Sequence, residues 1–266
     1  RIVAICFFGL LKPLRQGMLV GLRRHLLLPL RRRGYSVDIF LHSSEAQMSY
    51  SNTRNNEPPT EVDPRKNAEV LQSFLTESFG SFGTADSFVR SFRCSFTFAE
   101  ESDRVFNSSD DSGLAKYLKH GDPWPETKGN SVRFLLRQLH MLFKVTEMWS
   151  GVTPVLNRSQ QLIEANGVII NASRLETYAA GVIYIRPDLL ILNSFPTHVL
   201  RTIQARSVED RTIAIPLIEH GGIHDRLAFG TPLALLLFGL RILSVLPLIH
   251  RAHMNVHSET FLNNFV

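Results

Sequence analysis

Residues 182–189 read Val-Ile-Tyr-Ile-Arg-Pro-Asp-Leu, a short apolar run followed by a polar triplet. β-Branched and aromatic residues in such a run predict a buried β-strand. Pro187 cannot donate to a sheet ladder, so it ends the pairing and turns the chain away. Arg186 and Asp188 are therefore expected at the carboxyl edge of a central strand, which is where open α/β sheets bind ligands.

The amino-terminal segment predicts a β-loop-α-β unit. The continuous apolar run Ile2–Phe8 is typical of a strand that is buried on both faces, and Gly9 ends it. A helix is expected from Met18 to Arg33, closed by Gly34, and Ser36–Leu41 predicts a second strand. Together these elements indicate an α/β fold with a mixed, mainly parallel, Rossmann-like sheet flanked by helices.

The middle of the chain alternates polar stretches with regular elements. Long polar loops are predicted near 43–64 and 100–128, with a short helix at 67–78 between them. Alternating polar and aromatic residues at 87–98 predict an edge strand. Residues 131–149 place apolar side chains at a period of 3.6, which predicts an amphipathic helix.

One apolar run, Leu233–Ile249, has to be assigned either to a membrane span or to the protein core. A span needs about 20 mainly apolar residues, and a cation in its middle costs about 2.5–3.5 kcal/mol. Arg241 and Pro247 interrupt this run, and Thr231-Pro232 before it fits an N-cap and a first helical position. We therefore expect a buried core helix and no membrane span.

Composition is that of a globular chain with a full core. The 266 residues are 44% hydrophobic and 20% charged, which favours one α/β domain over residues 1–266. Of the net charge of +5, much lies in Arg23, Arg24 and Arg31–Arg33 on the first predicted helix. Such a cluster is either a solvated helix face and C-terminus or a site for phosphate-rich nucleic acid or anionic lipid. Because no aromatic residues interleave with it, we expect no nucleic-acid partner.

The cysteines and glycosylation sequons leave the compartment open. Cys6 and Cys94 form neither a disulfide framework nor a zinc motif. Sequons at Asn107, Asn157 and Asn171 would permit glycosylation in a secretory lumen, but such triplets also arise by chance. Cytoplasmic and secretory locations are both compatible with the sequence.

Two segments carry residues suited to phosphate chemistry. Gly9 is followed by Lys12 and Arg15, so backbone amides and a cation can approach a phosphate there, although an ordinary turn with surface cations has the same sequence. Arg186 offers a forked donor to a diphosphate, and Asp188 offers a hard oxygen that suits Mg²⁺ or Mn²⁺. The alternative for Asp188 is to cap the turn after the strand.

Two further segments add candidates. Residues 221–226 read Gly-Gly-Ile-His-Asp-Arg, where the glycines permit close backbone approach and Asp225 can accept a proton from a sugar hydroxyl. A Gly-Gly turn with a structural Asp–Arg pair is the alternative. On the amphipathic helix, Arg137 and Gln138 can point across the sheet edge towards a nucleotide.

In sequence order, these segments resemble those of one family. They are Ile2–Gly9, Val37–His42, Arg137–Val145, Val182–Asp188, Gly222–Gly230 and His257–Leu262. With these pieces the chain resembles glycosyltransferase-like proteins of the GT-A, nucleotide-diphospho-sugar transferase type. Arg-Pro-Asp after an apolar strand and Asp-Arg-x-Ala-Phe-Gly are the most specific matches.

The resemblance implies one GT-A-like domain that binds a nucleotide sugar at the strand edge. It implies that the Gly9 loop, which contains Lys12 and Arg15, lies near the donor nucleotide, for which Arg137 and Arg186 are the further candidates from the residues themselves. It places Asp188 at the diphosphate or metal position, with Mn²⁺ or Mg²⁺ as the ion. It places Asp225 near the acceptor and offers Glu259 as a further acidic candidate in the tail.

Two positions depart from the family pattern. Arg186 stands where the metal motif Asp-x-Asp has its first acid, and Lys12 stands where an arginine is frequent. The expected function is transfer of a sugar from a nucleoside-diphosphate donor to a hydroxyl of a glycan, protein or lipid. The alternative is a non-catalytic protein of the same fold that acts in binding or as a scaffold.

Overall fold

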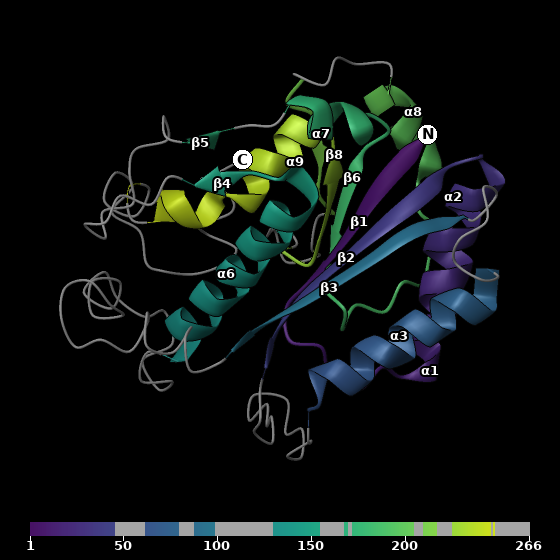
Figure 1. Ribbon diagram of the computed structural model, residues 1–266. Coiled ribbons are helices and arrows are strands. Elements are labelled where there is room, and N and C mark those ends of the chain that lie inside the picture. Colours follow the sequence, from purple (N-terminus) through teal and green to yellow (C-terminus); the bar gives the residue numbers. More distant parts are fainter. Residues whose placement is uncertain are drawn as a thin grey trace.

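A computed structural model describes residues 1–45, 62–79, 88–98, 130–154, 168–169, 172–204, 210–216, 225–245 and 247 (Figure 1). Its main feature is a six-stranded mixed sheet in the order β3-β2-β1-β6-β8-β7. The strands are β1 (Ile2–Phe8), β2 (Ser36–Glu45), β3 (Val89–Phe98), β6 (Val182–Ile185), β7 (Ile213–Ala214) and β8 (Leu227–Gly230). The three pairings among β3, β2, β1 and β6 are parallel, whereas β8 runs antiparallel to both of its neighbours. The predicted α/β class with a mainly parallel sheet is confirmed.

Helices cover both faces of this sheet (Figure 1). One face carries the continuous helix formed by α1 (Gln16–Gly21), the π-helical turn η1 (Leu22–Leu27) and α2 (Leu28–Arg32), together with α3 (Pro64–Phe79) and α8 (Thr197–Gln204). The other face carries α6 (Asn130–Ser150), α7 (Ala172–Thr177), α9 (Pro232–Gly239) and the 3₁₀ turn η5 (Arg241–Ser244). A separate pair of short antiparallel strands joins β4 (Thr153–Pro154) to β5 (Val168–Ile169).

Strand β1 has the predicted bounds and is buried on both faces. Val3, Ile5 and Phe7 pack on the α1 and α3 side, and the alternate side chains pack against α6. This follows from the period of two along a strand, so a run without polar residues suits a strand that is covered twice.

The sequence prediction was wrong at the end of one strand and omitted another. Strand β2 continues to Glu45, although a loop was expected from residue 43, because β3 pairs with it as far as Glu45 and Phe98. Backbone pairing sets a strand's length, so the polar side chains at its end do not stop it. Strand β8 was not predicted; its four residues carry no β-branched side chain, and they form a strand by pairing with β6 and β7.

Helices appear where periodicity predicted them. The predicted helix at 131–149 is α6, and the predicted helix at 67–78 is α3, extended at both ends. The buried helix expected over Leu233–Ile249 is α9, which already ends at Gly239. Most of the two predicted polar loops and all of residues 248–266 lie outside the described residues. Among the described residues, none of the helices combines the length and apolar character needed to cross a bilayer.

The first helix contains a wide turn that the sequence analysis did not predict. Pro29 has no N–H to donate to the carbonyl of His25, four residues earlier. That carbonyl accepts instead from the backbone N–H of Phe195, at 2.6 Å. The carbonyl of His25, left without a partner inside the helix, therefore binds the segment after β6 to η1 through a hydrogen bond.

Helix α6 approaches α9 and β6 through a buried polar cluster. The hydroxyl of Tyr184 accepts from Trp149 Nε1 at 2.8 Å and donates to Thr146 Oγ1 at 2.7 Å, since Thr146 itself donates to the carbonyl of Leu142. Gly239 of α9 lies directly against this cluster. A Cβ on Gly239 would stand 2.0 Å from Thr146 Oγ1 and 2.7 Å from the Tyr184 hydroxyl.

Candidate functional site

The strand order reverses between β1 and β6. The chain proceeds from β1 to β2 and β3 in one direction, then returns to β6 on the other side of β1. In open α/β sheets, ligands bind beyond the carboxyl ends of the strands at such a point. Gly9 follows β1 here and Arg186 follows β6, so both predicted segments lie at this location.

Gly9 lies beside the residues that follow β6. Its φ of +117° is accessible to glycine and strained for other residues. A Cβ at Gly9 would lie 3.8 Å from Cδ of Pro187 and 3.9 Å from Cγ of Arg186. The first loop therefore passes directly beside the Arg-Pro-Asp turn.

Arg186 and Asp188 form a two-pronged ion pair. Arg186 Nε donates to Asp188 Oδ1 at 3.1 Å, and Nη2 donates to Oδ2 at 2.7 Å. The two side chains are 24% and 25% exposed, so the pair is at the surface yet partly shielded from water. The backbone N–H of Arg186 donates to the carbonyl of Arg226 at 2.8 Å, which fixes the base of the side chain.

Gln138 of α6 connects this pair to Asp225. Its Oε1 accepts from Arg186 Nη1 at 3.4 Å, and its Nε2 donates to Asp225 Oδ2 at 3.0 Å. Because β8 is antiparallel to β6 and pairs Ile185 with Leu227, the residues just before β8 lie beside those just after β6. Asp188, Arg186, Gln138 and Asp225 therefore form one hydrogen-bonded row, named here the edge row.

A buried arginine interacts electrostatically with Asp225 of the edge row. Arg241 is 2% exposed, its Cζ lies 3.8 Å from the centre of the Phe238 ring, and its Nε has no hydrogen-bond partner among the described residues. Burial lowers the pKa of Arg241 to about 10, and the negative charge of Asp225 opposes that shift. Asp225 therefore accepts a hydrogen bond from Gln138 and also interacts electrostatically with the buried cation Arg241.

The other predicted site residues have varied positions. Lys12 is half-buried, and its backbone N–H donates to the carbonyl of Leu10. Arg15 is exposed at the N-cap of α1, where its carbonyl accepts from Met18. Arg137 is half-buried on α6, next to the Gln138 that contacts Arg186. Glu259 lies outside the described residues.

Asp188 already has a cationic partner. Because the guanidinium of Arg186 engages both carboxylate oxygens, a divalent cation at Asp188 would have to compete with this ion pair. The positive charge next to Asp188 is thus the guanidinium of Arg186. Separately, no group of three or more His, Cys, Asp or Glu side chains with the arrangement of a metal site occurs among the described residues.

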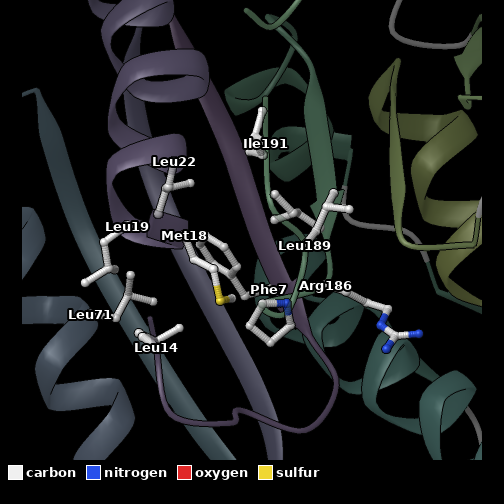
Figure 2. A pocket seen from close by; sticks show the side chains of 11 residues that line it. Phe7, Leu14, Met18, Leu19, Leu22, Leu71, Arg186, Leu189 and Ile191 are labelled. Carbon is white, nitrogen blue, oxygen red and sulfur yellow. The ribbon is translucent and has the colours of Figure 1, made fainter. Parts of the chain in front are cut away.

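An apolar pocket adjoins the edge row on the α1 side of the sheet (Figure 2). Leu14, Met18, Leu22, Leu71, Leu189 and Ile191 are among its lining residues. Arg186 contributes to the wall, and Figure 2 shows its guanidinium directed away from the pocket. Arg186 therefore spans two environments, with its stem against apolar side chains and its charge towards α6.

A second polar cluster lies at the carboxyl end of β2. His42 is 4% exposed, and its Nδ1 lies 2.5 Å from Ser95 Oγ on β3. Burial, with the charges of His140 and Lys144, lowers the pKa of His42 to about 3. Burial and Lys144 lower the pKa of His140 to about 4. An imidazole that resists protonation this strongly is a weak base, so the His42–Ser95 pair is poorly suited to nucleophilic catalysis.

These lowered pKa values predict loss of stability in acid. The unfolded chain protonates its histidines near pH 6.5, whereas the folded chain does so only near pH 3 and 4. The free energy of unfolding should therefore fall as the pH drops below about 6.5, by up to about 1.4 kcal/mol per pH unit for each histidine. Urea unfolding at several pH values measures this decline.

The variant His42→Asn isolates the contribution of His42 to this pH dependence of stability. Asparagine keeps a polar atom near the position of Nδ1, so the contact with Ser95 is preserved while the titrating ring is removed. Between about pH 6 and pH 4, the free energy of unfolding of the variant should fall less steeply than that of the wild type. The two slopes should differ by the contribution of one proton, ~1.4 kcal/mol per pH unit. Equal slopes for the two proteins would contradict the assignment.

Gln138 and Arg241 are the members of the site that sequence reasoning valued least. Gln138 appeared only as the neighbour of Arg137, because an amide has no distinctive chemistry in a sequence. Arg241 was seen only as an interruption of an apolar run. That interruption was the available signal, since a cation within a buried helix needs a reason to be there.

The chain was also compared with known proteins. No model of a known protein family matches it, and neither the curated proteins nor the solved structures contain a significant match. Its function must therefore be inferred from the arrangement of its own residues.

Proposed function

We propose that the protein is a glycosyltransferase of the GT-A type, which transfers a sugar from a nucleoside-diphosphate donor to a hydroxyl acceptor. The observation that carries the proposal is the edge row itself. A cation and a carboxylate that follow β6 are joined through Gln138 of α6 to a second carboxylate before β8, at the point of strand-order reversal. The close passage of Gly9 beside Arg186 adds a flexible backbone at the same place.

In this proposal three side chains of the edge row divide the chemistry of transfer. Asp225 accepts the proton of the acceptor hydroxyl as its oxygen forms a bond to the sugar's anomeric carbon. The bond from that carbon to the diphosphate breaks, and the diphosphate leaves with the electron pair. Arg186 turns its fork from Asp188 to the departing diphosphate and stabilises the developing charge. Gln138 holds Asp225 and Arg186 in register.

The non-catalytic alternative has one specific observation in its favour. Both oxygens of Asp188 are engaged by Arg186, and Asp225 accepts from Gln138, so the polar groups satisfy one another without a ligand. A row of this kind can simply hold the edge of the sheet together. The two readings differ in what removal of one carboxylate does.

The variant Asp225→Asn tests the proposed base. Asparagine keeps an oxygen that can accept from Gln138 and loses the ability to take a proton. For catalysis we expect turnover of nucleotide sugars to fall about 100-fold, while affinity for the nucleoside diphosphate stays nearly constant. Release of nucleoside diphosphate from a panel of nucleotide sugars, with and without simple alcohol acceptors, measures turnover.

Asp63→Asn is the matched control. Asp63 is exposed, and its Oδ1 accepts from the backbone N–H of Lys66 at 3.0 Å, a contact that asparagine can keep. This variant should turn over donor at the wild-type rate. If no donor of the panel is bound or hydrolysed by the wild type, the non-catalytic alternative is favoured instead.

A further inference from the structure

The helix α1–η1–α2 and its caps carry a long basic surface. The first 37 residues contain no Asp or Glu. The exposed cations from one cap to the other are Arg15, Arg23, Arg24, Arg31, Arg32 and Arg33. At 1.5 Å of rise per residue they extend over about 27 Å. Such a surface attracts a partner that presents many negative charges.

Large apolar side chains are exposed beside these cations. Val20 of α1 is 50% exposed, and Leu190 and Leu192 are 50% and 69% exposed. The described part of the chain exposes six large hydrophobic side chains, and three of them are therefore in two segments, the first helix and the stretch after β6. Exposed apolar residues that gather at one place, unlike scattered ones, indicate an interaction surface.

Backbone contacts place the two segments side by side. A Cβ at Gly21 would stand 2.7 Å from the carbonyl oxygen of Ile191, and the N–H of Phe195 bonds the carbonyl of His25. Figure 2 shows Leu189 and Ile191 around the apolar pocket, opposite Leu19 and Leu22 of the helix.

Leu190 and Leu192, which follow Leu189 and Ile191 in the chain, face solvent and not the pocket. Leu190 and Leu192 alternate with Leu189 and Ile191 along the chain, and they are exposed where the pocket residues are half-buried. On the helix, Val20 and Arg24 are one turn apart and so are neighbours. Apolar and basic side chains therefore share one area of the molecule.

We propose that this area, the basic-apolar surface formed by Val20, Arg23, Arg24, Leu190 and Leu192, docks on an anionic lipid bilayer. The aliphatic side chains enter the boundary between headgroups and acyl chains, and the arginines contact lipid phosphates. A nucleic acid would use the cations but gains nothing from exposed leucines, and in the described part of the chain the large side chains exposed beside these cations are all aliphatic, so they offer no stacking surface for bases. The docking surface does not depend on the glycosyltransferase proposal.

Vesicle co-sedimentation tests the proposal with the full chain. One set of vesicles is pure phosphatidylcholine, and the other is an equimolar mixture with phosphatidylglycerol. The wild type should sediment with the mixed vesicles only. The double variant Arg23→Glu, Arg24→Glu should weaken this binding about 600-fold, since each basic residue contributes about fivefold and reversing two of them counts as four such contributions. The variant Leu190→Ser, Leu192→Ser should weaken it about tenfold.

A control with the same change in net charge is Arg93→Glu, Arg211→Glu. Both side chains are exposed; Arg93 lies on β3 over the ring of Phe40, and Arg211 lies before β7. This variant should bind the mixed vesicles nearly as the wild type does. Thermal unfolding of every variant checks that each is folded before binding is compared.

Three results would overturn the proposal. The first is a wild type that does not bind mixed vesicles. The second is an equal loss of binding in the control and in the Arg23, Arg24 variant, which would indicate a response to net charge alone. The third is binding to duplex oligonucleotides that the arginine variant loses and the leucine variant keeps, without vesicle binding, which would make the surface a nucleic-acid site.

Discussion

Gly239→Ala is expected to lower the free energy of unfolding by about 4 kcal/mol. The added methyl carbon would stand 2.0 Å from Thr146 Oγ1 and 2.7 Å from the hydroxyl of Tyr184, so α9 must move or the cluster must open. Overpacking a core costs about 1–3 kcal/mol, and a buried hydroxyl that loses its partner costs about 1–3 kcal/mol more. Thermal or urea unfolding followed by circular dichroism measures the loss.

Gly17→Ala is the matched control for that experiment. Gly17 lies in α1, and no atom is within 4 Å of the position that a Cβ would take. Alanine should therefore leave stability unchanged or raise it by up to about 0.5 kcal/mol, because it restricts the unfolded chain. If Gly239→Ala were as stable as Gly17→Ala, the close approach of α9 to α6 and β6 would be wrong.

Arg186→Ala is expected to reduce turnover of the nucleotide-sugar donor about 1000-fold. Under the proposed function, Arg186 is the cation that meets the diphosphate where the family motif has an acid and a metal. Losing a positioned donor of this kind costs about 100- to 1000-fold, or more where a full charge is stabilised. Arg186→Lys keeps the charge and loses the fork, so it should be about tenfold better than alanine.

Measurements of thermal stability distinguish a catalytic role of Arg186 from a purely structural one. Arg186 and Asp188 are partly exposed, and ion pairs in that position contribute only about 1 kcal/mol or less. Arg186→Ala and Asp188→Asn should thus unfold at nearly the same temperature as each other. If both variants lose a similar, small stability while nucleoside-diphosphate affinity is unchanged in Arg186→Ala, the edge row only supports the fold.

The sequence predicted the elements whose surroundings are uniform along their length. Ile2–Phe8 is apolar at every position because both faces of β1 are covered, and its bounds were predicted correctly. The periodic apolar stripe of α6 likewise reveals a helix with one buried side. In each case the local pattern records the burial of the same residues, so no distant partner is needed to interpret it.

Elements that depend on a distant partner were missed. β8 is a strand because β6 offers it a backbone edge, and the far end of β2 is a strand because β3 does. The wide turn η1 arises because Phe195 takes the carbonyl that Pro29 leaves unpaired. Hydrogen bonds between residues far apart in the chain leave no periodic signal.

For the candidate site, the sequence determined which residues bear the chemistry, and only the tertiary structure decided which of them meet. The strand ending in Arg186 and Asp188, and the later Asp225, were identifiable from residue type and local order. Their joining through Gln138 depends on the position of α6 over the sheet and on the antiparallel return of β8. A strand order and a helix crossing are set by packing of the whole core, which no short stretch of sequence records.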